Sequence, residues 1–296
     1  MNIPFFIVDV FAERRYTGNQ LAVFPDATGL SDDEMQTITR EMHFSETTFI
    51  HPYDQGSHEY RVRIFTPEHE VPFAGHPVLG TAQVIRAEIL KENSSRIILH
   101  VPAGPIPVRF ETDDAGDGLV WMRQNAPVFL QQFTSAELAP VLSLPDTAFD
   151  RRFPIETVST GLPFIIVPLL SRDAVQAVRI NRDAYFSLIT GTIAKAVYVF
   201  CSEPCHPENT IHARMFGDYY GVSEDPATGS AAGCLAAYLV KNHYFSPYRE
   251  EIRIEQGYEV HRPSLLFCRT EHEGEEISVD VGGKVVQVAK CELFRE

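Results

Sequence analysis

The segment EDPATGSAAG, residues 224–233, carries the clearest chemistry in the sequence. Gly229 and Ser230 lie where a helix should begin, and the small residues after them would let that helix approach other backbone closely. The free N–H groups at a helix start, together with the helix dipole, can bind a carboxylate without a positive side chain. Asp225 lies just before this predicted anion site and is therefore a candidate functional residue. Turn and capping roles for Asp225 and Ser230 explain the same pattern.

A second helix start is predicted in FAGHPVLG, residues 73–80. Gly75 permits a backbone turn, His76 lies at the helix entrance, and Pro77 lacks an N–H group that would be unpaired there anyway. The segment thus combines a helix start with one titratable imidazole. A single histidine is usually structural or exposed, so a functional role for His76 depends on its pairing with the segment around Asp225.

Glu46 is the third candidate and lies in HFSETTFI, residues 43–50. It follows a predicted helix and stands beside an apolar stretch typical of a strand. A carboxylate in this position is a helix cap, an edge charge, or a buried acid with a raised pKa. The residue alone does not distinguish these three roles.

The elements that must position these residues are mostly strands, with few helices between them. Ser31 is typical of a helix N-cap, because acidic residues follow it and the apolar residues up to Met42 recur at helical spacing. Further helices are predicted at residues 77–90, 135–142, 183–190 and 230–242. Strands are predicted at residues 5–11, 21–24, 46–51, 60–65, 96–101, 105–111, 118–124, 155–159, 164–169, 196–200 and 210–216, with several more toward the C-terminus. This mixture indicates an α+β fold with a boundary near residues 125–130.

One unit of strand, loop and helix occurs twice along the chain. Arg63-Ile-Phe-Thr-Pro leads through a loop to Gly75-His76-Pro77, and Arg214-Met-Phe-Gly-Asp leads through a slightly longer loop to Gly229-Ser230. If the two halves are duplicates, their equivalent loops would face each other across a cleft suited to a small ligand. Coincidence between two common units explains the spacing equally well.

Composition excludes several classes of function. The 296 residues are 44% hydrophobic, enough for about two domains with buried cores. With 40 acidic and 25 basic residues the net charge is −15, which disfavours binding to nucleic acid or to anionic membranes. The first residues read as a strand, and the longest apolar run, residues 162–170, is too short for a membrane span and contains two prolines. We therefore expect a cytoplasmic protein.

The cysteines and histidines do not predict a metal site. Five cysteines form no dense framework, and reduced thiols are the simple interpretation. Cys201, Cys205, His206 and His212 lie close together in the sequence, but their spacing matches no strong ligand pattern. The prolines at positions 204 and 207 favour a polar loop instead. The glycine-rich segments also lack the spacing of dinucleotide or P-loop sites, so we expect no cofactor.

The chain resembles the PhzF family of phenazine biosynthesis-like isomerases. The resemblance rests on motifs that occur in family order and span nearly the whole chain: GNQLAVF (18–24), FSETTFI (44–50), RIFTPEHEVPFAGHPVLGTA (63–82), STGLPFIIVP (159–168) and RMFGDYYGVSEDPATGSAAG (214–233). It implies a diaminopimelate epimerase-like fold, with two similar domains that each wrap a mixed sheet around a central helix and with the active site in the cleft between them. The expected domains are residues 1–126 and 127–285, and a C-terminal strand near 286–296 could join the first.

The resemblance also implies site residues and a reaction. The family's acid/base carboxylate corresponds to Glu46, and its supporting polar residues correspond to His76, Asp225 and Ser230. Asn19, Gly75 and Gly229 are expected to help bind the substrate. The helix starts carry no cysteine, so the two-thiol mechanism of related epimerases is not available.

The predicted function is a cofactor-independent proton shift on a small carboxylate-bearing metabolite, carried out by a homodimer as the resemblance implies. Epimerisation of a small amino or hydroxy acid is equally compatible. A protein that binds a metabolite without catalysis is an alternative on the same fold. A serine hydrolase using Ser230 is less favoured, because the chain contains no G-x-S-x-G motif.

Overall fold

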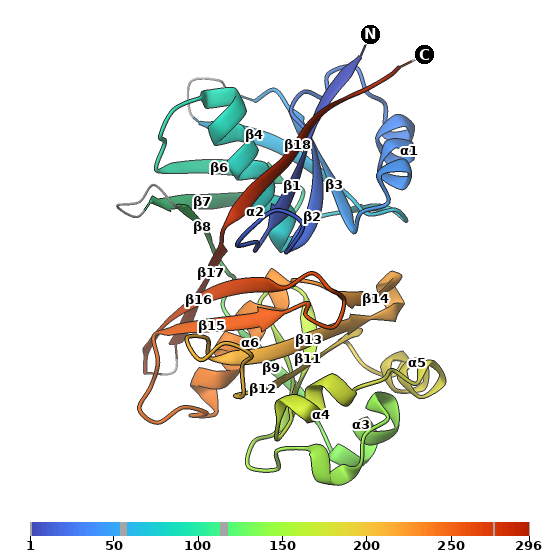
Figure 1. Cartoon of the computed structure of the whole chain (residues 1–296), viewed down its shortest axis with the longest axis vertical. Helices are drawn as coiled ribbons and strands as arrows, with labels where there is room; N and C mark the ends of the chain where they lie inside the picture. Colours follow the sequence, from blue (N-terminus) through green and yellow to red (C-terminus); the bar gives the residue numbers. More distant parts are fainter. Residues whose placement is uncertain (1, 54–57, 113–117, 275, 296) are drawn as a thin grey trace. The chain divides into compact units, whose positions relative to one another are not determined.

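The computed structural model describes residues 2–53, 58–112, 118–274 and 276–295 (Figure 1). The chain divides into two compact units. The first unit contains residues 1–123 and 282–296, and the second contains residues 124–281. These boundaries fall a few residues before those expected from the sequence, and the C-terminal segment belongs to the first unit.

The first unit is a mixed sheet around one helix. Its strands are β1 (Ile3–Val10), β2 (Asn19–Phe24), β3 (Glu46–His51), β4 (Glu59–Phe65), β5 (Glu70–Val71), β6 (Arg96–Val101), β7 (Gly104–Thr112), β8 (Gly118–Arg123) and β18 (Val285–Leu293). They pair in the order β18, β1, β2, β3, β4, β6, β7, β8. The pairs β2–β3 and β4–β6 are parallel, and the other pairs in this order are antiparallel.

The central helix of this unit is α2 (Gly75–Val84), which continues into the π-helical segment η1 (Ile85–Leu90). It contacts strands along the whole sheet, from β18 through β1, β2 and β3 to β6, β7 and β8. All of its residues except Gln83 are buried, as expected for a helix that is apolar on every side. The helix predicted at residues 77–90 is confirmed, and it starts two residues earlier than expected.

The second unit repeats this arrangement. Its strands are β9 (Val128–Phe133), β10 (Ile155–Ser159), β11 (Pro163–Pro168), β12 (Ala196–Cys201), β13 (Ile211–Gly217), β14 (Val222–Asp225), β15 (Glu251–Gln256) and β16 (Ser264–Glu273). They pair in the order β9, β10, β11, β12, β13, β15, β16. The central helix α6 (Gly229–Lys241) contacts β10, β11 and β16, and all of its residues except Ser230 and Lys241 are buried. The strand β17 (Glu276–Gly283) contains the second boundary between the units.

The internal duplication is therefore real and not a coincidence of spacing. The run β1, β2, β3, β4, β6, β7 and the run β10, β11, β12, β13, β15, β16 have the same sequence of antiparallel and parallel pairings. In each run a short strand, β5 or β14, pairs with the preceding strand and leads into the central helix. The two sequence segments that begin with Arg63 and Arg214 lie at this equivalent place.

An equivalent arginine–glutamate ion pair occurs in both units, where the short strand leads into the central helix. Nε and Nη2 of Arg63 donate to the two carboxylate oxygens of Glu70 at 2.8 and 2.6 Å. Nε and Nη2 of Arg214 donate to those of Glu224 at 2.8 and 2.7 Å. Such bidentate pairs restrict geometry more than single contacts do. Each arginine therefore holds the short strand that directs the chain toward the start of the central helix.

The remaining helices lie outside these centres: α1 (Asp32–Met42), α3 (Ser135–Leu142), α4 (Arg172–Ala177) and α5 (Arg182–Thr190), with the short 3₁₀ turns η2 (Asp146–Ala148) and η3 (Asp218–Tyr220). The N-cap predicted at Ser31 is confirmed as a capping box with Glu34. Helix α4 and the short strands β5 and β14 were not predicted, because each is too short for a clear periodic pattern. Within the described ranges, no helix combines the length and apolar character that a membrane crossing requires.

Gly80 shows how closely α2 approaches the sheet. A Cβ atom at Gly80 would lie 2.6 Å from Cδ2 of Leu21 and 2.9 Å from Cγ2 of Val10. We expect Gly80→Ala to lower the free energy of unfolding by about 1–3 kcal/mol through overpacking. Gly191→Ala is the matched control, because among the described residues none beyond its chain neighbours has an atom within 4 Å of the added Cβ, and its effect should stay within about 0.5 kcal/mol. Urea unfolding of both variants measures the difference, and equal stability would contradict this account of the packing.

Candidate active-site residues

In the first unit, three polar side chains come together, each from the start of a strand or a helix. Asn19 is the first residue of β2, Glu46 is the first residue of β3, and His76 is the second residue of α2. Because β2 and β3 are parallel, with Leu21 opposite Glu46, both strands begin at the same edge of the sheet. Gly75 lies beside His76 in the first turn of α2. The sequence-predicted residues of this unit are therefore neighbours in space.

His76 connects the other two residues. Its Nε2 atom lies 3.4 Å from Oε2 of Glu46, and its Nδ1 atom lies 3.4 Å from Nδ2 of Asn19. His76 and Asn19 are buried, whereas the Glu46 side chain keeps 17% of its surface exposed. A carboxylate with partial access beside a buried imidazole is suited to exchange protons with a small molecule.

The imidazole of His76 is neutral at neutral pH. Burial lowers the pKa of His76 to about 3, and a hydrogen bond with the backbone of Gln20 opposes this shift only in part. Nε2 of His76 is buried and has no hydrogen-bond partner among the described residues. Contacts of this length in a protein without substrate commonly tighten when the substrate binds. A neutral His76 can therefore orient Glu46 or a bound group without forming a strong ion pair.

The second unit surrounds Asp225 with fixed hydrogen bonds. Asp225 ends β14 and is buried, and its Oδ2 atom accepts a hydrogen bond of 2.6 Å from the Thr228 hydroxyl. Nε2 of Gln256 donates to the Asp225 carbonyl at 2.7 Å and to the Thr228 hydroxyl at 3.0 Å. The Tyr198 hydroxyl in turn donates to Oε1 of Gln256 at 3.0 Å. This network fixes the turn that leads into α6.

Sequence reasoning missed Thr228, Gln256 and Tyr198. Thr228 follows Asp225 by three residues, a spacing that could have indicated a side-chain contact across a turn. Gln256 and Tyr198 come from other strands: Gln256 reaches Asp225, and Tyr198 reaches Gln256, because β13 pairs with both β12 and β15. Such long-range proximity has no local signal in a single sequence.

The two central helices differ from the outer helices at their starts. The helices α1, α3, α4 and α5 have N-cap side chains, from Ser31, Thr134, Ser171 and Asn181, that accept a hydrogen bond from the first turn. The N-cap residues of α2 and α6, Ala74 and Thr228, make no such bond. Thr228 uses its hydroxyl for Asp225 instead. The side chain of the N-cap residue therefore does not cap the first N–H groups of either central helix, a property typical of anion sites.

Gly229 and Ser230 lie in the first turn of α6, at positions equivalent to Gly75 and His76 in α2. Gly229 is buried, and Ser230 is partly exposed in a helix whose neighbouring residues are buried. Ser230 is thus the side chain of this turn that can reach a ligand. The structure brings Asp225, Gly229 and Ser230 together in the second unit, as it does the other predicted residues in the first.

Comparison with known proteins decides the family. A family described as phenazine biosynthesis-like protein (PhzC-PhzF) matches residues 8–291. The chain belongs to the PhzF family. The trans-2,3-dihydro-3-hydroxyanthranilate isomerase of Pseudomonas aeruginosa is 38% identical to this PhzF family member over 292 residues, which cover 98% of this chain and 99% of that protein. The family predicted from the motifs is confirmed, and the chain is classed as an isomerase.

Solved structures give the same result for the fold of this PhzF family member. A phenazine biosynthesis protein of the PhzF family from Bacillus anthracis matches with a TM-score of 0.91 at 29% identity and covers 100% of both chains. A probable proline racemase from Agrobacterium radiobacter matches with a TM-score of 0.64 at 10% identity, over 99% of this chain and 93% of that one. The second likeness shows the fold alone. The predicted α+β fold of the epimerase and racemase type is confirmed.

The low pKa of His76 predicts how stability depends on pH. The pKa is about 3 in the folded chain and about 6.5 in the unfolded chain, so between these values the unfolded chain binds the extra proton. The stability that a neutral His76 permits is complete above about pH 6.5 and is lost as the pH falls, by up to about 1.4 kcal/mol per pH unit. We expect His76→Gln to make the free energy of unfolding less dependent on pH between about pH 7 and 5.

Urea unfolding at a series of pH values measures this difference. His69→Gln is the control, since it makes the same substitution at an exposed histidine. Identical pH curves for the parent chain and His76→Gln would contradict the assignment of a neutral, buried imidazole.

Proposed function

We propose that this protein is a cofactor-independent isomerase that moves a proton between two carbon atoms of a small carboxylate-bearing metabolite. Glu46 acts as the general base and then as the general acid. The observation that supports this proposal is the Glu46–His76 pair, 3.4 Å apart, at the uncapped start of a buried helix. Isomerases of the same family, with one named for trans-2,3-dihydro-3-hydroxyanthranilate, supply independent support.

The proposed reaction begins when the Glu46 carboxylate removes a proton from an acidic C–H bond. Negative charge then develops on the substrate, and positioned N–H donors must stabilise it if the step is to be fast. The first-turn N–H groups near Gly75 and Gly229 can provide such donors, and Ser230 can add a hydroxyl. Glu46 returns the proton to a second carbon, while His76 and Asp225 position the substrate or relay protons. Asn19 supports the orientation of His76.

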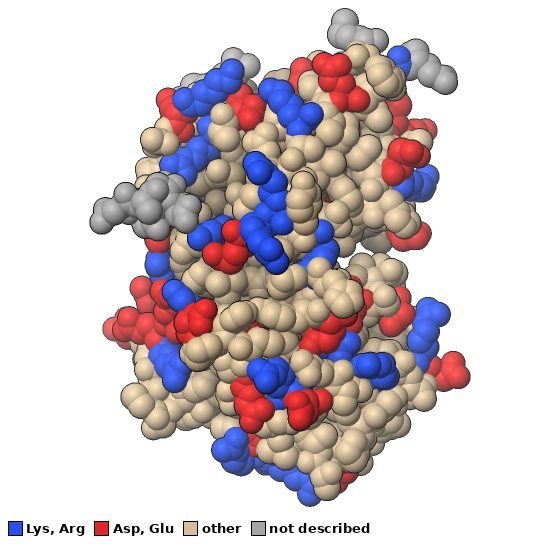
Figure 2. Space-filling view, viewed as in Figure 1, with Lys and Arg blue, Asp and Glu red and all other residues tan. Residues whose placement is uncertain are grey.

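Local donors matter because the whole chain repels anions. The net charge is −15, and Figure 2 shows acidic and basic side chains interspersed over the visible face of the two units. Long-range attraction therefore does not concentrate a carboxylate near the site. Binding of an anionic substrate would rely on helix starts and hydrogen bonds at short range.

Replacement of the base is the direct test. Glu46→Gln keeps the shape of the side chain but removes the proton acceptor, so kcat should fall by roughly 10²–10⁴-fold while KM changes little. Glu59→Gln is the matched control, because Glu59 also contacts a histidine, with its Oε2 atom 2.6 Å from Nε2 of His100, but lies outside the candidate site. Trans-2,3-dihydro-3-hydroxyanthranilate is the first substrate to assay. Normal turnover by Glu46→Gln would refute the assignment of the base.

Solvent exchange separates an isomerase from a binding protein. The purified chain is incubated in D₂O with a panel of small amino, hydroxy and cyclic carboxylic acids, and NMR follows deuterium incorporation at carbon. We expect exchange on at least one substrate, and we expect it to disappear in Glu46→Gln. Tight binding of a compound without exchange would instead favour the non-catalytic alternative. Inversion at the exchanged carbon would identify epimerisation.

Ser230 distinguishes substrate binding from nucleophilic catalysis. If its hydroxyl binds an anionic group, Ser230→Ala should raise KM by about 10-fold or more, as expected for loss of a hydrogen bond to a charged group, and should change kcat little. In a serine hydrolase the same change would remove the nucleophile and abolish turnover. Steady-state kinetics with Ser230→Ala therefore decides between these roles.

We also propose that the protein is a cytoplasmic homodimer and that it binds neither nucleic acid nor membranes. Light scattering on the purified chain measures the mass of the assembly.

A further inference from the structure

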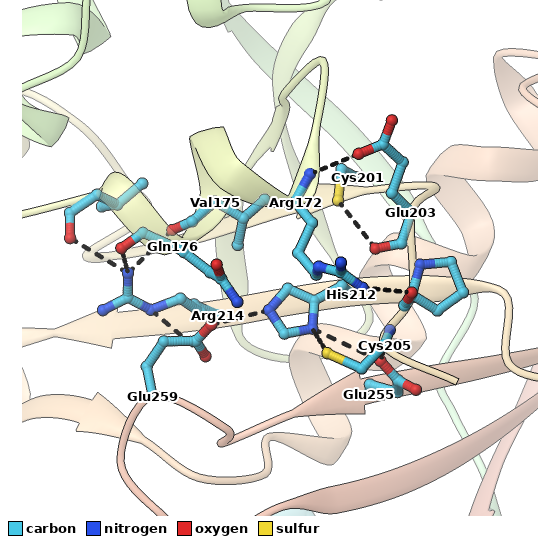
Figure 3. Close-up of polar contacts among 12 residues, drawn as sticks. Arg172, Val175, Gln176, Cys201, Glu203, Cys205, His212, Arg214, Glu255 and Glu259 are labelled. Atoms are coloured by element: carbon cyan, nitrogen blue, oxygen red, sulfur yellow. Dashed lines mark hydrogen bonds and ion pairs between the residues drawn. The ribbon is translucent and has the colours of Figure 1, made fainter. Parts of the chain in front are cut away.

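A separate cluster of metal-ligating side chains lies in the second unit. Sγ of Cys205, a ring nitrogen of His212 and a carboxylate oxygen of Glu255 all lie within 4.8 Å of one another (Figure 3). Cys205 comes from the loop between β12 and β13, His212 from β13, and Glu255 from β15. His212 and Glu255 are opposite each other in the parallel register of the two strands, so the sheet itself sets their separation.

The distances in this cluster are close to those between neighbouring ligands of one ion. Nδ1 of His212 lies 3.8 Å from Sγ of Cys205 and 3.6 Å from Oε2 of Glu255. N–H···O hydrogen bonds usually measure ~2.7–3.2 Å between heavy atoms. Neighbouring ligands of a tetrahedral Zn²⁺ ion, with bonds of about 2.0–2.3 Å, lie ~3.3–3.6 Å apart. Small side-chain movements would therefore bring all three atoms to bonding distance.

Further hydrogen bonds orient two of the three candidate ligands, His212 and Glu255. Nε2 of His212 lies 2.9 Å from Oε1 of Glu259, which favours the tautomer with its proton on Nε2 and its lone pair on Nδ1. The Glu255 carboxylate accepts hydrogen bonds from the backbone N–H groups of Cys205 and His206, at 2.6 and 2.9 Å, and from Asn209 at 2.6 Å. A histidine held by a carboxylate, beside a ligand carboxylate held by N–H groups, is common around zinc.

Charge and access also suit a cation. The carboxylates of Glu255 and Glu259 lie on either side of the His212 ring, at 3.6 Å from Nδ1 and 2.9 Å from Nε2 (Figure 3). A dication beside these carboxylates would be attracted to them, and it would stabilise a thiolate at the neighbouring cysteine.

The cluster can be reached from solvent on one side. His212 and Glu255 are fully buried, whereas Cys205 is partly exposed and lines a surface hollow. The hollow is also lined by Ser202, Pro204, Asn209, Phe245 and Arg249. An ion could enter on the Cys205 side, and a water molecule from the hollow could complete its coordination.

We propose that Cys205, His212 and Glu255 bind a Zn²⁺ ion. A thiolate, an imidazole and a carboxylate suit Zn²⁺, whereas Mg²⁺ and Ca²⁺ prefer oxygen ligands alone. The ion fastens the loop after β12 to the paired strands β13 and β15, and its role is structural. It is not part of the proposed proton shift.

The ligand set differs from the cysteine and histidine group noted in the sequence. Cys201 is fully buried in the hydrophobic core of the second unit, and its Sγ atom donates to the Glu203 carbonyl. His206 contributes its backbone N–H to Glu255. Glu255, which follows His212 by 43 residues, supplies the third ligand and could not be recognised from local spacing.

Cobalt provides a spectroscopic test on the full-length chain. The protein is first treated with a chelator and dialysed, and Co²⁺ is then added as the probe. We expect saturation at one equivalent, intense visible bands typical of tetrahedral Co²⁺, and a near-ultraviolet band from thiolate to cobalt. Zn²⁺ should displace Co²⁺ and remove these bands.

Variants assign the ligands. Cys205→Ser should abolish the thiolate band, whereas Cys291→Ser, which changes the other partly exposed cysteine, should leave it intact. Glu259→Gln keeps all three ligands and should weaken Zn²⁺ affinity by about 10–100-fold, measured by competition with a chromophoric chelator. Circular dichroism of each variant in chelator checks that it folds. Glu46→Gln should bind Co²⁺ as the parent does, so this test is independent of the proposed reaction.

Three results would each overturn the proposal: no thiolate band at one equivalent of Co²⁺, an unchanged band in Cys205→Ser, or loss of the band in Cys291→Ser. Unchanged Zn²⁺ affinity in Glu259→Gln would remove the role assigned to that carboxylate.

Discussion

The burial of one apolar helix inside each curved sheet is the constraint on which the other features depend. A helix start has N–H groups without partners in the helix, and in a buried helix these groups must find another partner or face a ligand. The outer helices solve this problem with Ser, Thr or Asn caps. The central helices α2 and α6 have no side-chain cap, and their first turns carry the candidate residues His76 and Ser230. The N–H groups at a helix start, which make these helices costly to bury, also suit them to binding anions.

The arginine clamps explain how such helix starts are kept in place. In both units a bidentate pair, Arg63–Glu70 or Arg214–Glu224, ties the short strand before the central helix to the longer strand beside it. The guanidinium groups also lie 5.0 Å from the ring of Phe65 and 4.8 Å from that of Phe216. Both contacts are thus repeated at the equivalent place in the two units. The candidate site residues are therefore positioned by neighbouring residues that are not themselves candidates.

Much of the fold could be predicted from the sequence because its signals are local. The cap at Ser31, the small residues after Gly229 and the proline at position 77 each specify a helix boundary within a few residues. The duplicated segment predicted the repeat, since the same order of residues recurs before both central helices. The contacts of Gln256 with Asp225, and of Glu255 with Cys205, follow from the pairing of β13 with β15. No local pattern specifies which strands become neighbours, so these partners could not be foreseen.

The differences between the two copies favour a reaction with one base. Glu46 begins β3, and the equivalent strand β12 begins with Ala196, a buried apolar residue. The second unit offers Asp225 instead, from β14, and there the carboxylate already accepts a hydrogen bond from Thr228.

An epimerase that works with two bases needs matched proton carriers in both units, one for each face of the reacting carbon. Here the first unit carries the Glu46 carboxylate beside the neutral imidazole of His76. In the second unit the Asp225 carboxylate already accepts a hydrogen bond from the Thr228 hydroxyl. A single base that removes a proton and returns it to another carbon on the same face of the substrate makes fewer demands on the second unit. The proposed single-base reaction therefore requires a proton carrier in the first unit alone.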